Sequence, residues 1–120
     1  MSKTETYMKI LSRFVTHGNV PKVLEKLAEL EELCDREIPW MDLINYPSKE
    51  SLALLAARHG HAPILKVLQL KRAPMLYFEL GNLDGKRPIH ESVEHKHMDC
   101  LEYLVDNIGV AVNSLKRADW

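Results

Sequence analysis

The chain has 120 residues, of which 46% are hydrophobic and 28% are charged, and its formal net charge is -1. This composition is typical of one globular domain and excludes a disordered or collagen-like chain. The near-neutral charge argues against a general nucleic-acid binder, because such proteins carry a clear excess of Lys and Arg.

The first 36 residues predict two helices joined by a tight turn. Ser2 and Glu5 have the spacing of a capping box at a helix start, and Pro21 fits the first turn of a second helix. Apolar residues recur at helical spacing in both segments: Tyr7, Leu11, Phe14 and Val15, then Val23, Leu24, Leu27, Leu30 and Cys34. We expect residues 1–36 to form a divergent N-terminal capping repeat with a polar outer face.

Residues 46–81 and 82–115 predict two further helical pairs, because one pattern recurs in them at a fixed offset. The matched positions, each 36 residues apart, are His59/His95, His61/His97, Leu65/Leu101 and Leu68/Leu104. A fixed offset of this length is the signature of a stacked repeat protein, in which each pair buries its apolar face against its neighbours. We therefore predict one domain over residues 1–120, an all-α helix-turn-helix repeat solenoid of about three helical pairs.

Residues 82–115 show how one pair is built. Asp84-Gly85 predicts a turn, and Pro88 fits the first turn of a short helix that ends near His95. Asp99 is expected to cap the next helix. The apolar face of that helix is expected to consist of Cys100, Leu101, Leu104 and Val105.

The carboxyl-terminal residues 116–120 predict the hairpin of a further repeat that is cut short. An uncapped last pair leads us to expect marginal stability or self-association through this end. The sequence has no run of about 18 apolar residues, so it predicts no membrane span, and its start lacks the apolar core of a signal peptide. Two cysteines make no disulfide framework, so we expect reduced thiols and a cytoplasmic or nuclear location.

Six histidines prompt a test for a metal site. His90 and His95 are five residues apart and would point about 140° away from each other on a helix, so they form no helical zinc pair. We expect His61, His90 and His97 to order turns and helix starts by hydrogen bonds. Cys34 and Cys100 lie on apolar stripes, where free cysteines are usually small core residues. We predict no metal, no cofactor and no enzymatic activity; a zinc-dependent enzyme is a weaker alternative.

The central motifs resemble the ankyrin repeat family, whose pattern is Gly-x-Thr-Pro-Leu-His-x-Ala-Ala-x-x-Gly-His. Residues 56–61 (Ala-Ala-Arg-His-Gly-His) are similar to its centre, and residues 85–90 (Gly-Lys-Arg-Pro-Ile-His) to its opening. The resemblance implies short β-hairpin loops and a role in binding another protein, through the hairpin tips and the exposed face of each first helix. In this chain that surface would consist of Arg58, His59, Leu83, Asp84, Lys86, Glu94, His95, Arg117, Ala118 and Trp120. Trp40 and Tyr46 would either join it or pack beneath the hairpin.

A narrower resemblance covers residues 56–61, 86–91, 99–100 and 115–120. These segments are similar to the opening repeats of a group within the family that assists alanyl-tRNA synthetase. The resemblance implies the synthetase as protein partner, with translational fidelity as the role. One alternative is an acceptor whose lysine, here Lys116, captures misactivated serine; the neighbouring Arg117 could lower the pKa of that amine but cannot itself act as a nucleophile. Another alternative is a fragment without a function of its own.

Overall fold

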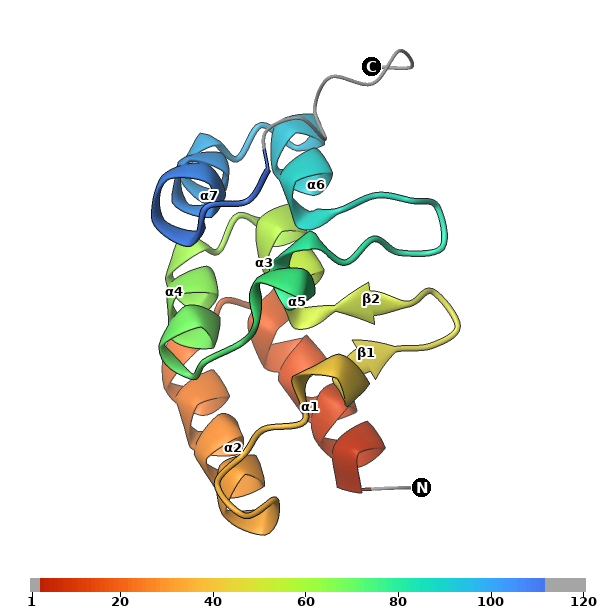
Figure 1. Cartoon of the computed structure of the whole chain (residues 1–120), viewed down its shortest axis with the longest axis vertical. Coiled ribbons are helices and arrows are strands. Elements are labelled where there is room, and N and C mark those ends of the chain that lie inside the picture. Colours follow the sequence, from red (N-terminus) through yellow and green to blue (C-terminus); the bar gives the residue numbers. More distant parts are fainter. Residues whose placement is uncertain (1–2, 112–120) are drawn as a thin grey trace.

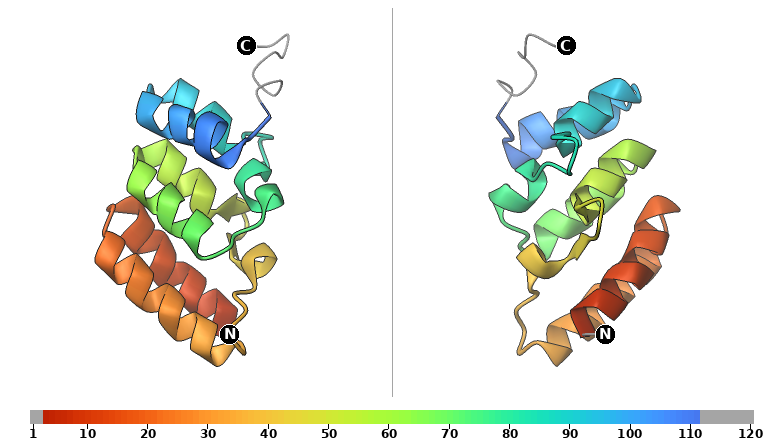
Figure 2. Two further views of the ribbon diagram at one scale, coloured as in Figure 1. Left: turned by 60° about the vertical axis from the view of Figure 1, so that its left-hand side comes forward. Right: turned by 90° about the vertical axis from the view of Figure 1, so that its right-hand side faces the viewer.

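A computed structural model of the chain describes residues 3–111. Its helices form antiparallel pairs that stack as three successive layers, which Figure 1 shows from the front and Figure 2 from the sides. The layers are α1 (Lys3–Thr16) with α2 (Val20–Leu33), α3 (Leu52–His59) with α4 (Ala62–Leu70), and α6 (Pro88–Glu94) with α7 (Met98–Glu102). The predicted architecture, an all-α helix-turn-helix repeat fold with a short β-hairpin, is confirmed.

The first pair is held together by an apolar stripe on each helix. Buried Met8, Leu11 and Val15 on α1 face a second stripe on α2, formed by Val23, Leu27 and Leu30. The prediction that Leu24 belongs to this stripe was wrong, since Leu24 is exposed. It lies about 100° around the helix from Val23, and the α2 stripe is too narrow to include both.

The second pair is entered through a short hairpin of β1 (Ile44–Asn45) and β2 (Glu50–Ser51), which are antiparallel and pair Ile44 with Ser51. Ser51 ends this strand and caps α3, because its hydroxyl accepts a hydrogen bond from the Leu54 backbone N–H at 3.1 Å. The whole first part of α3, from Leu52 to Ala57, is buried. This helix is therefore the centre of the stack, with pairs on both sides of it.

The linker between the second and third pairs is fixed by a buried tyrosine. Tyr77 lies on α5 (Met75–Glu79) and is fully buried. Its hydroxyl donates to the Leu43 carbonyl at 2.6 Å and accepts from the Leu52 N–H at 2.9 Å, so it joins the segment before the hairpin to the start of α3. Trp40, in a 3-10 turn at Trp40–Asp42, packs 5.3 Å from this ring and is also buried.

The third pair begins as the sequence predicted and differs in its second helix. The Arg87 N–H donates to Nδ1 of His90 at 3.0 Å, so His90 orders the start of α6 as expected. The prediction that Asp99 caps α7 was wrong: the residue before this helix is His97, and Asp99 lies inside the first turn. There its carboxylate accepts from the Cys100 N–H at 2.9 Å. A π-helical segment, Tyr103–Ile108, continues α7.

The turns within the first two pairs are each covered by a histidine of the pair that follows. Gly18 (φ +69°) lies beneath the ring of His61, and a Cβ on this glycine would be 2.7 Å from that ring. Gly60 (φ +77°) has the same relation to His97, at the same distance. The Nε2 of His61 also donates to the Thr16 carbonyl at 3.0 Å. Positive φ and close approach together require glycine at both turns.

Candidate protein-binding face

Two loops and the helices beside them form one side of the molecule. The β1–β2 hairpin and the loop that precedes α6 project in the same direction in Figure 1, away from the outer helices α2, α4 and α7. A backbone hydrogen bond of 3.1 Å from Leu83 N–H to the Ser48 carbonyl joins the two loops. The hairpin is also tied to α1, since the Asn45 amide donates to the Ser12 hydroxyl at 2.9 Å. We call this side, with its residues Tyr46, Glu50, Arg58, Leu83, Lys86, Glu91, Glu94 and His95, the hairpin face.

Two large apolar side chains stand at the tips of the loops. Tyr46 is 74% exposed and Leu83 is 70% exposed. The alternatives left open for Trp40 and Tyr46 are thus separated: Trp40 packs in the core, whereas Tyr46 lies in solvent at the hairpin. Neither Tyr46 nor Leu83 is needed to fill the interior of the fold, so both are available to a partner.

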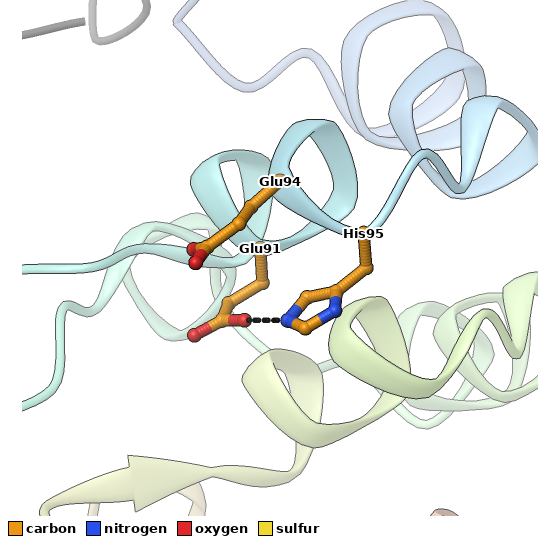
Figure 3. A group of neighbouring side chains, drawn as sticks. All are labelled: Glu91, Glu94 and His95. Atoms are coloured by element: carbon orange, nitrogen blue, oxygen red, sulfur yellow. Dashed lines mark ion pairs between the residues drawn. The ribbon is translucent and has the colours of Figure 1, made fainter.

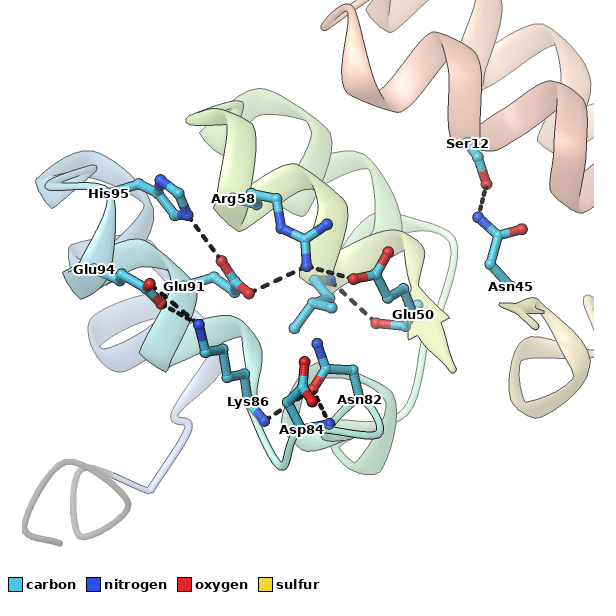
Figure 4. Close-up of polar contacts among 12 residues, drawn as sticks. Ser12, Asn45, Glu50, Arg58, Asn82, Asp84, Lys86, Glu91, Glu94 and His95 are labelled. Atoms are coloured by element: carbon cyan, nitrogen blue, oxygen red, sulfur yellow. Dashed lines mark hydrogen bonds and ion pairs between the residues drawn. The ribbon is translucent and has the colours of Figure 1, made fainter. Parts of the chain in front are cut away.

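Arg58 joins the second and third pairs at the centre of the hairpin face. Its guanidinium donates from α3 to Glu50 on β2 and, at 3.2 Å, to Oε1 of Glu91 on α6, as Figure 4 shows. The hydrogen bond from Arg58 lowers the pKa of Glu50 below its ordinary value. The same bond raises the pKa of Arg58, so this group stays charged at every physiological pH. The three side chains form a fixed charged bridge between successive repeats.

A second charged group lies at the outer edge of the face. Asn82 shapes the loop, because its side-chain oxygen accepts from the N–H groups of Asp84 at 2.9 Å and Lys86 at 3.0 Å. The Lys86 ammonium then donates to both oxygens of Glu94, at 2.9 and 3.1 Å. This contact raises the pKa of Lys86 and lowers the pKa of Glu94. Both side chains are about half exposed, so the pair adds little to stability.

Histidines line the end of the face that is nearest the turns. His95 Nε2 lies 3.1 Å from Oε2 of Glu91, one turn before it on the same chain segment. The His95 and His97 rings stack with centroids 6.3 Å apart. His59 is exposed, and partial burial followed by the nearby Arg58 charge lowers its pKa. A lowered pKa keeps His59 neutral at physiological pH.

The predicted site residues divide into two groups. The structure brings Arg58, Lys86, Glu94 and His95 together on the hairpin face and places Leu83 and Asp84 in its exposed loop. His59 lies beside this group. The other predicted residues, Lys116, Arg117, Ala118 and Trp120, lie outside the described residues, and their roles stay predictions from the sequence.

Glu50 and Glu91 belong to the hairpin face but were not among the residues predicted from the sequence. Glu50 belongs to the hairpin, and Glu91 occupies the position 36 residues after the core residue Leu55. Glu91 is buried to 2% exposure, which no local pattern distinguishes from an ordinary helical surface glutamate. One signal was present: Glu91 and His95 are four residues apart in a predicted helix, and residues with that spacing share a face.

Cys100 sits in a setting that does not favour a reactive thiolate. Cys100 is fully buried, and burial raises the pKa of its thiol to about 12. Its Sγ lies 3.9 Å from the Ala56 carbonyl, so it packs α7 against α3. Cys34 is half-buried at the end of α2. The interpretation of Cys100 as a core residue is confirmed.

The third helical pair lies in the part of the chain that matches a known protein family. Residues 84–117 match the model of the ankyrin repeat family. The match covers the Asp84-Gly85 turn and α6, and so includes most of the third pair's share of the hairpin face. It supports the ankyrin repeat family for this chain and, with it, a protein-interaction module in a non-enzymatic fold. No solved structure matches the chain. Within residues 3–111, no helix combines the length and the apolar character that crossing a bilayer requires.

Proposed function

We propose that this chain is a protein-interaction module that holds its partner against the hairpin face. The observation that carries the proposal is that two exposed apolar tips, Tyr46 and Leu83, lie on the same side as charged side chains of α3, α6 and the loop before α6. A backbone hydrogen bond joins the two loops, so these apolar side chains stand at neighbouring tips, and exposed apolar side chains that are grouped in this way are typical of a protein-binding surface. The ankyrin repeat match supports the same role.

The two kinds of residue have different tasks in such an interface. Aromatic and large aliphatic side chains supply most of the binding free energy when a partner removes them from water. The surrounding charges set the orientation of the partner and the rate of encounter. Arg58 is already paired with Glu50 and Glu91, so it presents a rigid surface rather than a side chain that must be ordered on binding.

The partner is proposed to be alanyl-tRNA synthetase. This assignment rests on the resemblance of residues 56–61, 86–91, 99–100 and 115–120 to the opening repeats of ankyrin repeat domain-containing protein sixteen. The hairpin face offers such an enzyme both cations and carboxylates beside its two apolar tips. The function that follows is support of translational fidelity, with the chain acting in the cytoplasm or nucleus.

The test compares the two loops with a matched control on the opposite side. Leu83→Ser and Tyr46→Ser remove the apolar tips, whereas Leu70→Ser removes an equally exposed leucine from the outer helix α4, since Leu70 is 69% exposed. Binding of purified alanyl-tRNA synthetase to each variant is measured by calorimetry. We expect the tip variants to weaken binding by at least about tenfold each, as hot-spot residues do, and Leu70→Ser to leave it unchanged.

The outcomes separate the two parts of the proposal. Loss of binding in the tip variants alone supports both the face and the partner. Equal weakening by Leu70→Ser contradicts the face, and no binding by the unaltered chain contradicts the synthetase as partner. In the second case, the same variants are used as baits in cell extract, and a protein that Leu70→Ser retains but Leu83→Ser loses supports the interaction module.

A further inference from the structure

Three potential metal ligands converge at the end of α6. Glu91, Glu94 and His95 each offer one ligand atom, and these atoms all lie within 4.8 Å of one another (Figure 3). The Nε2 of His95 and Oε2 of Glu91 are 3.1 Å apart. Two ligand atoms bound to one zinc ion, each at about 2.1 Å, are about 3.4 Å apart in tetrahedral geometry. This edge of the cluster therefore already has close to the spacing that a shared ion requires.

One atom of the cluster is a buried acceptor without a hydrogen bond. Glu91 is 2% exposed, and its Oε1 accepts from Arg58, but its Oε2 has no hydrogen-bond partner. The Nε2 of His95, 3.1 Å away, makes an ion pair with Oε2 only when the imidazole is protonated, and no hydrogen bond joins the two atoms. A buried carboxylate oxygen left in this state is costly, and a cation removes the cost. Because Arg58 holds Oε1, Oε2 alone faces the cluster and would bind an ion through one oxygen.

The carboxylates around the cluster outnumber the cationic side chains, so the local charge favours binding of a cation. Three carboxylates, those of Glu50, Glu91 and Glu94, face the two cationic side chains of Arg58 and Lys86. Lys86 forms an ion pair with Glu94, but both side chains are about half exposed, so breaking this ion pair costs little free energy. Glu94 and His95 are themselves exposed and can adjust by the small movement that a common ion needs.

In contrast to the expectation from the sequence that the chain binds no metal, we propose that Glu91, Glu94 and His95 bind a Zn²⁺ ion on the hairpin face. An imidazole nitrogen with two carboxylate oxygens is a ligand set that suits zinc better than magnesium or calcium, which prefer oxygen alone. Three protein ligands leave a fourth position for water or for a group supplied by a bound partner. The ion competes with Lys86 for Glu94, so zinc binding frees the Lys86 ammonium on the same face.

Calorimetric titration of Zn²⁺ into the full chain, with Cys34 and Cys100 kept reduced, tests the proposal. We expect one ion per chain. His95→Ala removes a ligand and should weaken binding by at least about tenfold. Lys86→Met removes the competing cation and should strengthen binding by up to about fivefold. His17→Ala is the matched control, because it deletes an exposed histidine of the first pair and should change nothing.

The opposite sign expected for Lys86→Met distinguishes this site from general attraction of zinc to surface histidines. Failure of the unaltered chain to bind one ion overturns the proposal, as does equal weakening by His17→Ala and His95→Ala. Loading with Co²⁺ provides an independent readout. A thiolate charge-transfer band in that spectrum would place the ion on a cysteine and would equally overturn the assignment. The folding of every variant is checked by circular dichroism.

Discussion

The inner helices α3 and α6 occupy equivalent places in successive repeats and bury different chemistry. From Leu52 to Ala57, α3 buries only apolar side chains, whereas α6 buries His90, Glu91 and Ser92 at the matching positions. The backbone of the repeat sets which positions are covered, so both helices bury the same segment. Polar residues are tolerated on α6 because partners are within reach: Arg58 for Glu91 and the Ile89 carbonyl, at 2.8 Å, for Ser92.

The difference indicates that the second pair contributes mainly apolar packing, whereas the third pair contributes charged side chains to the surface. The second pair lies between two neighbours and is packed on both sides, with contacts from α4 to α2 and to α7. The third pair buries fewer apolar side chains on its inner helix, and together with the loop before it the pair supplies Lys86, Glu91, Glu94 and His95 to the hairpin face. Each of the following substitutions tests one side of this contrast.

The largest expected effect comes from a cavity in the second pair. Leu68 is fully buried on α4, a helix that contacts both the first and the third pair, and its counterpart 36 residues later is the buried Leu104. Leu68→Ala should lower the free energy of unfolding by about 2–5 kcal/mol, measured by denaturant titration. Leu104→Ala should cost less, since the second pair packs on both sides. An equal or larger loss at Leu104 would show that the third pair contributes as much packing as the second.

A substitution at the turn of the second pair tests the packing of the His97 ring against Gly60. Gly60→Ala places a Cβ 2.7 Å from the His97 ring and adds a side chain at positive φ, so we expect a loss of about 1–3 kcal/mol in unfolding free energy. Gly85→Ala is the control, because Gly85 has a similar φ of +76° but no atom within 4 Å of the added Cβ. If both variants lose the same stability, the backbone strain at positive φ alone explains why Gly60 is a glycine, and its contact with His97 contributes nothing.

The stabilisation that the Arg58–Glu50 ion pair gives to the second pair and its hairpin should depend on pH. Because Arg58 lowers the pKa of Glu50 in the folded state, the stabilisation is fully present above the unfolded value of about 4.3. It is lost as the pH falls through the lower pKa of the folded protein. Glu50→Gln should therefore be less stable than the unaltered chain at neutral pH, by less than about 1 kcal/mol, and the gap should close in acid. A gap that is constant with pH would show that the charge of Glu50 does not contribute.

The smallest effect is expected at the turn of the third pair. Lys96 (φ +60°) stands at the position that corresponds to Gly60, 36 residues earlier. Lys96→Gly relieves the strain of a positive φ but adds freedom to the unfolded chain, so we expect a gain of only about 0.5 kcal/mol. Thermal denaturation of the two proteins in parallel measures it. A loss of stability would show that the Lys96 side chain makes a contact worth more than the strain.

The sequence was sufficient for the architecture because the architecture depends on repetition. The recurrence of His61 at His97 and of Leu68 at Leu104 fixed the repeat, and helical spacing located the buried stripes. The errors were local: Leu24 lies beside its stripe rather than in it, and Asp99 lies one step inside the helix it was expected to cap. Spacing gives the phase of a helix but not its exact start or the width of its buried face.

The site was predictable only where residues lie on the surface by virtue of their position in the repeat. Arg58, Lys86, Glu94 and His95 lie together on one side of the molecule because the repeat places them there, and their role in binding stays a prediction. The bridge through Glu91 was not predictable, since its partner Arg58 is 33 residues away and no local pattern reveals the contact. The identity of a residue as glutamate does not show whether its carboxylate is buried or exposed.

The histidines that cover the turns of the first two pairs also affect the order in which these turns can be completed as the chain leaves the ribosome. The hydrogen bond from His61 to Thr16 spans 45 residues, so the first helical pair emerges long before the ring that covers its turn has been made. The same delay recurs at Gly60, which waits for His97. The turns of the first and second pairs are thus each completed by a residue that is translated after them.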